Sequence, residues 1–176
     1  MKLLSETGVS FARIIPDLEE APFEGEHPYN FAERLARDKA LQVARRSEAG
    51  DAVIGCDTVV VLEGEVLGKP ANESDAYEIL SRLSGKRHVV CTALAIAEHS
   101  GILASGYELT EVRFNKVTAE QIREYIATGE PMDKAGAYGI QGMGAFLVDS
   151  IKGELDTVIG FPRTLLERLA KQVIEE

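Results

Sequence analysis

The chain has 176 residues, of which 45% are hydrophobic and 27% charged, and its formal net charge is −10. This length and composition fit one globular domain spanning residues 1–176, and no apolar run approaches the roughly 20 residues of a membrane helix, so a cytoplasmic protein is expected. The negative charge argues against a nucleic-acid polymer as partner, but a small anionic ligand needs only a few well-placed cations.

The first half of the chain is predicted to contain two strands. Residues 10–15 (SFARII) are typical of a short strand, and residues 16–28, acidic and interrupted by proline and glycine, of a loop. Residues 52–62 form a continuous apolar run, which is typical of a strand covered on both faces.

A long helix is predicted between these strands, over residues 29–47. Pro28 suits its first turn. Its apolar positions recur at helical spacing: Phe31, Leu35, Val43 and Ala44.

The middle of the chain predicts a second helix and a hairpin. The helix covers about residues 73–84, with Asn72 or Ser74 as its N-cap and Gly85 just beyond its end. Two long strands follow, at about 87–97 and 103–115.

The last third predicts two further helices and a strand. Thr118 and Gln121 have the spacing of a capping box, opening a helix that ends at Gly129. A glycine-rich segment follows, then a short strand (FLVDSI) and a helix after Pro162. A hairpin among helix–strand units predicts an α/β or α+β fold with a mixed sheet in one continuous domain.

Cysteine and histidine give no sign of a metal site. Cys56 and Cys91 lie in apolar runs without CxxC spacing, so both are expected to be buried, reduced thiols. The histidines at 27, 88 and 99 have no ligand spacing either.

Asp57 is the first residue whose position calls for a chemical explanation. It lies inside an apolar strand, where an ionised carboxylate is costly unless it is paired. An active-site acid tuned by burial and nearby cations satisfies this condition, and so does a structural ion pair. Both interpretations stay open on spacing alone.

Three further features contain the polar groups of a candidate site. Lys69 lies in Gly-Lys-Pro, which holds the backbone extended, and its amine has the reach for a phosphate or for Asp57. In RLARDKA, Arg34 and Asp38 are one helical turn apart while Lys39 faces elsewhere, although a solvated charged face is the default explanation. Residues 133–142 (DKAGAYGIQG) form a tight loop in which Gln141 has an amide able to read a base.

The sequence resembles the Maf family of nucleoside triphosphate pyrophosphatases, once named for inhibition of septum formation. The motifs that match are GCDTVVVLEGEVLGKP, RLARDKA, RLSGKRH, PMDKAGAYGIQGMGA and GELDTVIGFP. The resemblance implies an elongated, curved mixed sheet flanked by helices, like that of inosine triphosphate pyrophosphatases. It also implies metal-dependent cleavage of a nucleoside triphosphate to the monophosphate and pyrophosphate, with Mg²⁺ or Mn²⁺ as the cation, and a homodimer.

The resemblance also assigns roles to individual residues. It implies that Asp57 is the general base for the attacking water, that Lys69 and Lys39 hold phosphate oxygens, and that Glu20 helps the metal or the water. It links Thr58 and Gln141 to the choice of base, in a form like the branch acting on dTTP and UTP. The matching glycine-rich motif adds Lys134 to the substrate-binding residues, while the metal ligands remain unassigned.

The start of the chain departs from the family pattern. Members normally begin with a strand and a loop like LASxSPRR, whose serine and arginines grip the phosphates, whereas this sequence starts at about KLLSETGVSF, within the helix expected to follow. The chain is therefore expected to be N-terminally truncated relative to the family, either because the start codon was placed too late or because the chain is naturally short. A naturally short chain is expected to lose one strand of the sheet and to expose a new edge. The alternative function that stays open is a catalytically impaired nucleotide-binding or regulatory module linked to septum formation.

Overall fold

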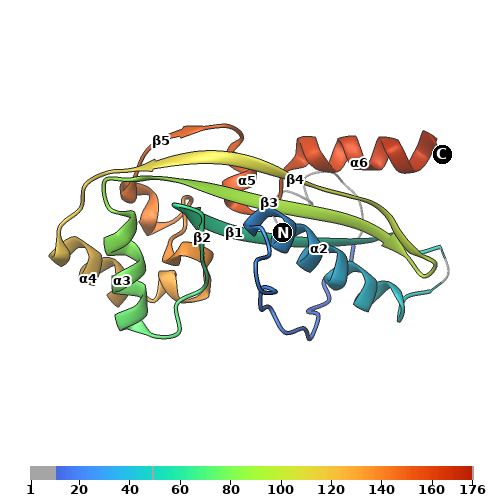
Figure 1. The fold of residues 1–176 in the computed structure, drawn as a ribbon, viewed down its shortest axis with the longest axis horizontal. Coiled ribbons are helices and arrows are strands. Elements are labelled where there is room, and N and C mark those ends of the chain that lie inside the picture. The colour runs from blue at the N-terminus through green and yellow to red at the C-terminus, as the bar shows by residue number, and fades with distance from the viewer. Residues whose placement is uncertain (1–10, 49, 176) are drawn as a thin grey trace.

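The computed structural model describes residues 11–48 and 50–175 as one sheet with helices on both faces (Figure 1). Its five strands are β1 (Val53–Leu62), β2 (Glu65–Leu67), β3 (Arg87–Glu98), β4 (Gly101–Phe114) and β5 (Val148–Lys152). The helices are α2 (Pro28–Ala44), α3 (Glu73–Leu83), α4 (Ala119–Ala127), α5 (Leu155–Ile159) and α6 (Arg163–Glu175). Three short 3₁₀ helices are η1 (Glu130–Asp133), η2 (Ala135–Ala137) and η3 (Met143–Leu147).

The strands are ordered β2-β1-β3-β4-β5, and every pairing in the described part of the chain is antiparallel. The prediction of a mixed sheet is therefore wrong for these residues. Strands β3 and β4 form the predicted hairpin, and β1 and β2 form a second one through Glu63 and Gly64, both at positive φ. After α3 the chain enters β3, which runs beside β1 in the opposite direction. The helix between these two strands therefore does not connect a parallel pair.

The strand predicted at residues 10–15 is also wrong where it is described. Residues 11–15 are irregular, and Ile14 and Ile15 are 58% and 78% exposed. Apolar composition alone does not make a strand without a neighbouring strand to complete its hydrogen bonds. Ser10, and the helix expected near the start of the chain, lie outside the described residues.

The predicted caps are confirmed. Asn72, rather than Ser74, caps α3 by accepting a hydrogen bond from Asp75 N at 3.0 Å, and Gly85 beyond it has φ 71°. Both hydrogen bonds of the capping box between Thr118 and Gln121 are present at the start of α4. These signals are local, so they need no tertiary partner.

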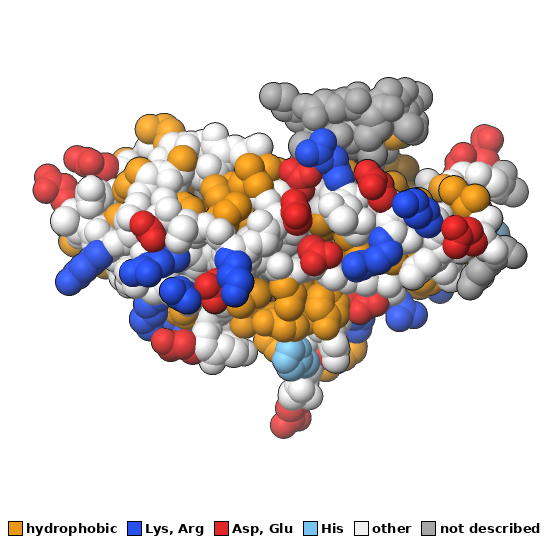
Figure 2. Space-filling view, turned by 90° about the horizontal axis from the view of Figure 1, so that it is seen from above, with side chains coloured by type: hydrophobic (Ala, Val, Ile, Leu, Met, Phe, Trp, Pro, Cys, Tyr) orange, Lys and Arg blue, Asp and Glu red, His pale blue; other side chains and the backbone are white. Residues whose placement is uncertain are grey.

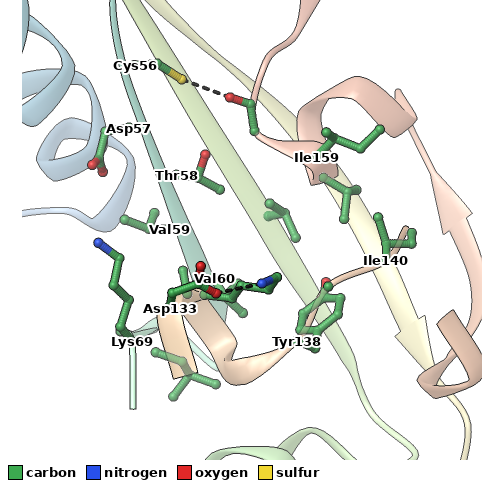
Figure 3. Close-up of a pocket in the computed structure, with 18 of the residues that line it drawn as sticks. Cys56, Asp57, Thr58, Val59, Val60, Lys69, Asp133, Tyr138, Ile140 and Ile159 are labelled. Atoms are coloured by element: carbon green, nitrogen blue, oxygen red, sulfur yellow. Dashed lines mark hydrogen bonds and ion pairs between the residues drawn. The ribbon is translucent and has the colours of Figure 1, made fainter. Parts of the chain in front are cut away.

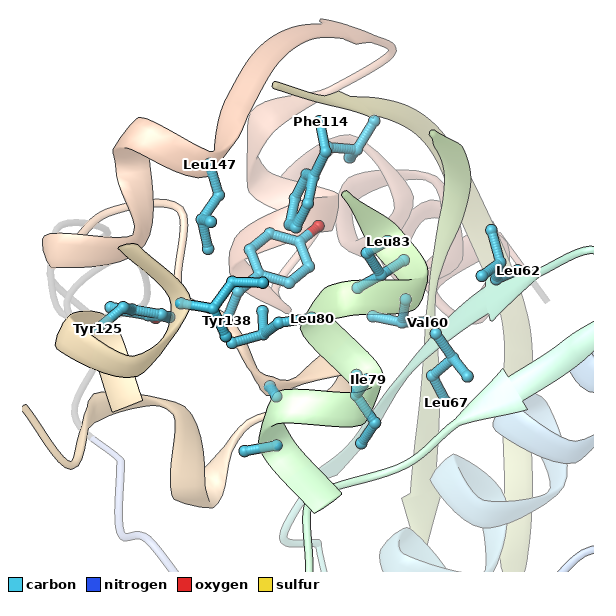
Figure 4. Close-up of a cluster of buried hydrophobic side chains, with 14 of the residues drawn as sticks. Val60, Leu62, Leu67, Ile79, Leu80, Leu83, Phe114, Tyr125, Tyr138 and Leu147 are labelled. Atoms are coloured by element: carbon cyan, nitrogen blue, oxygen red, sulfur yellow. The ribbon is translucent and has the colours of Figure 1, made fainter. Parts of the chain in front are cut away.

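Two main hydrophobic clusters hold helices against opposite faces of the sheet. The larger lies under α3 and α4 and contains Val60, Leu80, Leu83, Phe114, Tyr125, Tyr138 and Leu147 (Figure 4). The other lies between α2 and the strands and consists largely of alanine: Ala32, Ala36, Ala40, Ala44, Ala93, Ala95 and Ala97. Such small side chains let α2 approach the sheet closely.

The face in Figure 2 carries acidic and basic side chains interspersed, and hydrophobic side chains gather at several places on it, one of them next to a histidine. Among the described helices none is long and apolar enough to span a membrane. Both cysteines are free thiols; Cys91 is buried as expected, whereas Cys56 is only partly so.

Candidate active site

A cleft of about 950 Å³ lies along β1 (Figure 3), and all seven residues to which the resemblance assigns a role line it. They come from distant parts of the chain: Glu20, Lys39, Asp57, Thr58, Lys69, Lys134 and Gln141. The cleft is walled by α2 on one side and by the glycine-rich segment and the end of α5 on the other. The sequence motifs therefore meet in one place.

An open strand edge explains how neighbouring residues of β1 both reach the cleft. Strand β2 pairs with β1 only at Val60–Leu62, so among the described residues nothing pairs with the outer edge of residues 53–59. Successive side chains of a strand point to opposite faces. Asp57 faces α2 and Thr58 faces α5, and the cleft extends around the edge between them (Figure 3).

A compact group of charges lies on the α2 side of the cleft. The amine of Lys39 is 2.5 Å from Asp57 Oδ1 and 2.5 Å from Glu20 Oε1. Lys69 Nζ lies 3.6 Å from Glu20 Oε2 and extends toward Asp57 (Figure 3). The side chain of Lys69 is 59% exposed, whereas those of Lys39 and Asp57 are 15% and 8% exposed. The site thus combines a buried ion pair with a more accessible cation.

Gly55 allows α2 to bring Lys39 this close to Asp57. It lies two residues before Asp57, on the same face of β1, and a Cβ atom there would be 2.1 Å from Ala36 O and 2.7 Å from Ala40 N. Ordinary contacts begin at 3.4 Å, so only glycine fits. Gly55 was not among the residues predicted for the site, although a glycine within a strand signals a close backbone approach.

Burial sets the protonation of the charged group. It raises the pKa of Asp57, and the attraction of Lys39 offsets this only in part. Burial by itself lowers the pKa of Lys39, but its two carboxylate partners outweigh that effect and raise the pKa overall. The pKa of Glu20 is raised by burial but lowered more by Lys39 and Lys69, so the net direction is down. Asp57 is therefore the carboxylate poised to take a proton.

The opposite side of the cleft combines apolar side chains with polar ones. Thr58 and Gln141 lie among walls formed by Val60, Tyr138, Ile140, Val158 and Ile159, and Glu130, Asp133 and Lys134 line the same side. Thr58 Oγ1 is 3.0 Å from Thr92 Oγ1 behind it. Gln141 is exposed, so its amide is accessible to a ligand.

Lys134 is held within its own loop. Its amine donates to Asp133 Oδ1 at 2.6 Å and to Glu130 O at 3.0 Å. Lys134 lines the cleft, but its amine has closer partners than the amine of Lys69, whose nearest carboxylate oxygen is 3.6 Å away.

Glu130 organises the glycine-rich loop, a role that the sequence analysis missed. Its carboxylate accepts hydrogen bonds from Met143 N at 2.8 Å, Gly144 N at 3.1 Å and the hydroxyl of Tyr125 at 2.9 Å. A Cβ at Gly142 would lie 2.3 Å from Glu130 Oε2. No local pattern could reveal this, because the amides that it binds lie 13 and 14 residues further along the chain.

The acidic side chains of the cleft could hold a divalent cation only if a bound substrate supplied further oxygen ligands. Within the described ranges no three metal-binding side chains form a ready-made site. Asp57 and Glu20 nevertheless provide two carboxylates around one amine in the lining of the cleft. Mg²⁺ is often bound by one or two carboxylates plus substrate phosphates, so the residues present fit that pattern.

Comparison with known proteins gives one consistent answer. Residues 1–173 match the family described as "Maf-like protein". A "dTTP/UTP pyrophosphatase" of Geobacter sulfurreducens is 46% identical over 164 residues, covering 92% of this chain and 85% of the relative. A protein of the same description from Symbiobacterium thermophilum is 45% identical over 161 residues, covering 92% of this chain and 82% of the relative. A human "Probable bifunctional dTTP/UTP pyrophosphatase/methyltransferase protein" is 40% identical, covering 99% of this chain and 30% of its own length.

Proposed function

Because this chain belongs to the family of Maf-like proteins, we propose that it is a nucleoside triphosphate pyrophosphatase that hydrolyses dTTP and UTP to the monophosphate and pyrophosphate. The observation that carries the proposal is the ion pair of Asp57 and Lys39 inside the cleft, with Glu20 and Lys69 beside it. A polyanionic substrate needs cations to hold its charge, and hydrolysis needs a base to orient and deprotonate water. This group of residues provides both.

Asp57 is the proposed general base. Its raised pKa makes it a better proton acceptor than an ordinary surface carboxylate, and its lining of the cleft gives water access to it. In the reaction Asp57 takes the proton of a water molecule as the water oxygen bonds to phosphorus. The bond between the α- and β-phosphate groups breaks, and its electrons leave with pyrophosphate.

Lys39 and Lys69 are the proposed phosphate-binding residues. Phosphoryl transfer is catalysed mainly by positioning and by charge stabilisation, which point charges on flexible stems supply. The exposed Lys69 meets the phosphates first, and the buried Lys39 stays between Asp57 and Glu20. Lys134 contributes positive charge from the facing loop.

A divalent cation completes the proposed site. Glu20 and Asp57 would hold Mg²⁺ or Mn²⁺ together with substrate oxygens, and the ion would neutralise charge that develops on the phosphates. The base would lie on the other side of β1, against Thr58 and Gln141. We also propose that the protein acts as a homodimer in the cytoplasm. Sedimentation of the purified protein measures its oligomeric state.

One assay tests the catalytic proposal. Pyrophosphate release is measured from dTTP, UTP, CTP and GTP, each with Mg²⁺ or Mn²⁺, for the wild type, Asp57→Asn and Asp51→Asn. Asp51 is an exposed acid shortly before β1, so its variant is the matched control. We expect turnover of dTTP and UTP that Asp57→Asn lowers by about 10²–10⁴-fold, while Asp51→Asn leaves it unchanged. Tight nucleotide binding without any pyrophosphate release would instead support a non-catalytic binding module.

A further inference from the structure

The segment that carries Glu20 has little structure of its own to keep it in place. It belongs to the blue loop that precedes α2 in Figure 1, and residues 11–23 form neither a helix nor a strand. Of residues 17–25, only Leu18 is not exposed. A segment with so few buried contacts opens easily. The position of Glu20 beside Lys39 therefore depends on side chains that bind the segment from outside.

Two side chains of α2 bind this segment, one on each side of Glu20. Gln42 accepts a hydrogen bond from Asp17 N at 2.8 Å and donates one to Asp17 O at 2.6 Å. Arg34 donates from Nη2 to Ala21 O at 3.0 Å. Asp17 precedes Glu20 by three positions and Ala21 follows it directly, so the backbone is fixed on both sides of the carboxylate.

Arg34 makes the stronger of the two attachments. Its Nε and Nη2 atoms donate to the two carboxylate oxygens of Glu26 at 2.7 and 2.8 Å, and such a paired contact is stronger and more directional than a single hydrogen bond. Its guanidinium carbon lies 4.0 Å from the ring centroid of Phe23. The contact with Asp38 that the spacing predicted is present but longer, at 3.4 Å. Arg34 thus ties several points of the segment to α2.

The lysines of the cleft also contact Glu20, but a substrate competes for them. Lys39 Nζ and Lys69 Nζ lie 2.5 and 3.6 Å from its carboxylate oxygens. In the proposed function both amines bind phosphate oxygens, so their attraction for Glu20 weakens when a nucleotide is bound. Arg34 and Gln42 lie outside the cleft lining, so their contacts with the segment persist in the complex.

We propose that Arg34 and Gln42 are positioning residues that keep Glu20 in the cleft, where it binds a divalent cation together with the substrate phosphates. The inference rests on the proposed function for the presence of that cation. It adds to the site two residues that do not line the cleft. Side chains that orient a metal ligand typically contribute about 10–100-fold to metal affinity or activity.

The test compares nucleotide binding with and without metal, so it does not depend on turnover. Titration calorimetry gives the dissociation constant of α,β-methylene-UTP, in which the bond to be cleaved is blocked, once with Mn²⁺ and once with EDTA. The metal ratio, defined as the EDTA constant divided by the Mn²⁺ constant, measures how much the metal tightens binding. A variant that only weakens the fold changes both constants alike. We expect Arg34→Met to lower the metal ratio by about tenfold and Gln42→Met to lower it by a smaller factor.

A double-mutant cycle separates the positioning of Glu20 from any other effect of Arg34. In Glu20→Gln the carboxylate is absent, so the metal ratio should already be low. Adding Arg34→Met to Glu20→Gln should then change the ratio by less than about twofold. An effect of Arg34→Met that is equally large with and without the Glu20 carboxylate would overturn the inference.

Arg82 provides the matched control. Its guanidinium group also binds one carboxylate through two nitrogen atoms, at 2.6 and 3.3 Å from the oxygens of Glu65, and it makes no hydrogen bond or ion pair with residues 17–26. Arg82→Met removes the same charge and should keep the metal ratio. If Arg34→Met does not fold, as judged by circular dichroism, Arg34→Lys carries the same test, because an amine lacks the planar fork that binds Glu26 and Ala21 O together.

Failure of the inference and failure of the proposed function give different results. An unchanged metal ratio in Arg34→Met or in Gln42→Met would overturn the role of that residue. An equal fall in Arg82→Met, or a wild type that Mn²⁺ does not help to bind the analogue, would overturn both roles. Absence of pyrophosphate release from UTP by the wild type would defeat the proposed function alone, because the metal ratio would still report on Glu20.

Discussion

Replacing Gly55 with alanine should separate the two charged residues at the centre of the site. The new Cβ would lie 2.1 Å from Ala36 O and 2.8 Å from Ala40 Cβ, whereas ordinary contact begins at 3.4 Å. The obstacle is helix backbone rather than a flexible side chain, so α2 must move away from β1 by about 1 Å. Lys39 lies on α2, so its amine retreats from Asp57.

The expected effects follow from that displacement. Overpacking of this kind costs about 1–3 kcal/mol. For a chain of this length the melting temperature should fall by about 2–12 °C, at about 2–4 °C per kcal/mol. A misplacement of about 1 Å at a reacting group can cost about 100-fold in rate, so kcat/KM for UTP should fall by up to that factor.

Calorimetry and pyrophosphate release measure the two effects, with Gly106→Ala as the control. Gly106 is also a strand glycine, but a Cβ there would meet Leu165 Cδ1 at an ordinary 3.5 Å. This variant should keep both stability and activity. A Gly55→Ala protein with the melting temperature and kcat/KM of the wild type would show that the close approach of α2 to β1 does not determine the site.

Two further predictions concern protonation. In Lys39→Met the acidic limb of the kcat/KM profile for UTP should move to higher pH, because loss of the cation favours protonated Asp57, while Glu20 remains as a like charge and Lys69 offsets it only weakly. The value of kcat/KM at high pH should also fall by about 10–150-fold, because a phosphate contact is lost. An acidic limb that does not move would exclude Asp57 as the titrating base. Burial lowers the pKa of His88 to about 4, below the 6.5 of a free histidine, so the unfolded chain binds the proton first, and stability is lost as pH falls from about 6.5 to about 4. Denaturant unfolding of His88→Gln should show about 3 kcal/mol less of this acid-induced loss than the wild type, and an equal loss in the two proteins would exclude His88 as its source.

The family, the main helices and the central hairpin could all be predicted from the sequence. Helical spacing predicted α2 to within one residue at its start, and the capping box located α4. Asp57 stood out because a carboxylate in an apolar strand demands a partner. These patterns depend on residues close together in the chain, so they can be recognised without knowledge of the tertiary structure.

The arrangement of the sheet and of the site was decided only by the tertiary structure. Strand direction depends on which segments complete each other's hydrogen bonds, and the expected mixed sheet is antiparallel throughout its described residues. The open edge of β1, which lets Asp57 and Thr58 share one cleft, follows from how short the pairing with β2 is. The contacts of Thr92 with Thr58 and Thr157 join residues 34 and 65 positions apart, and no local pattern encodes distances of that kind.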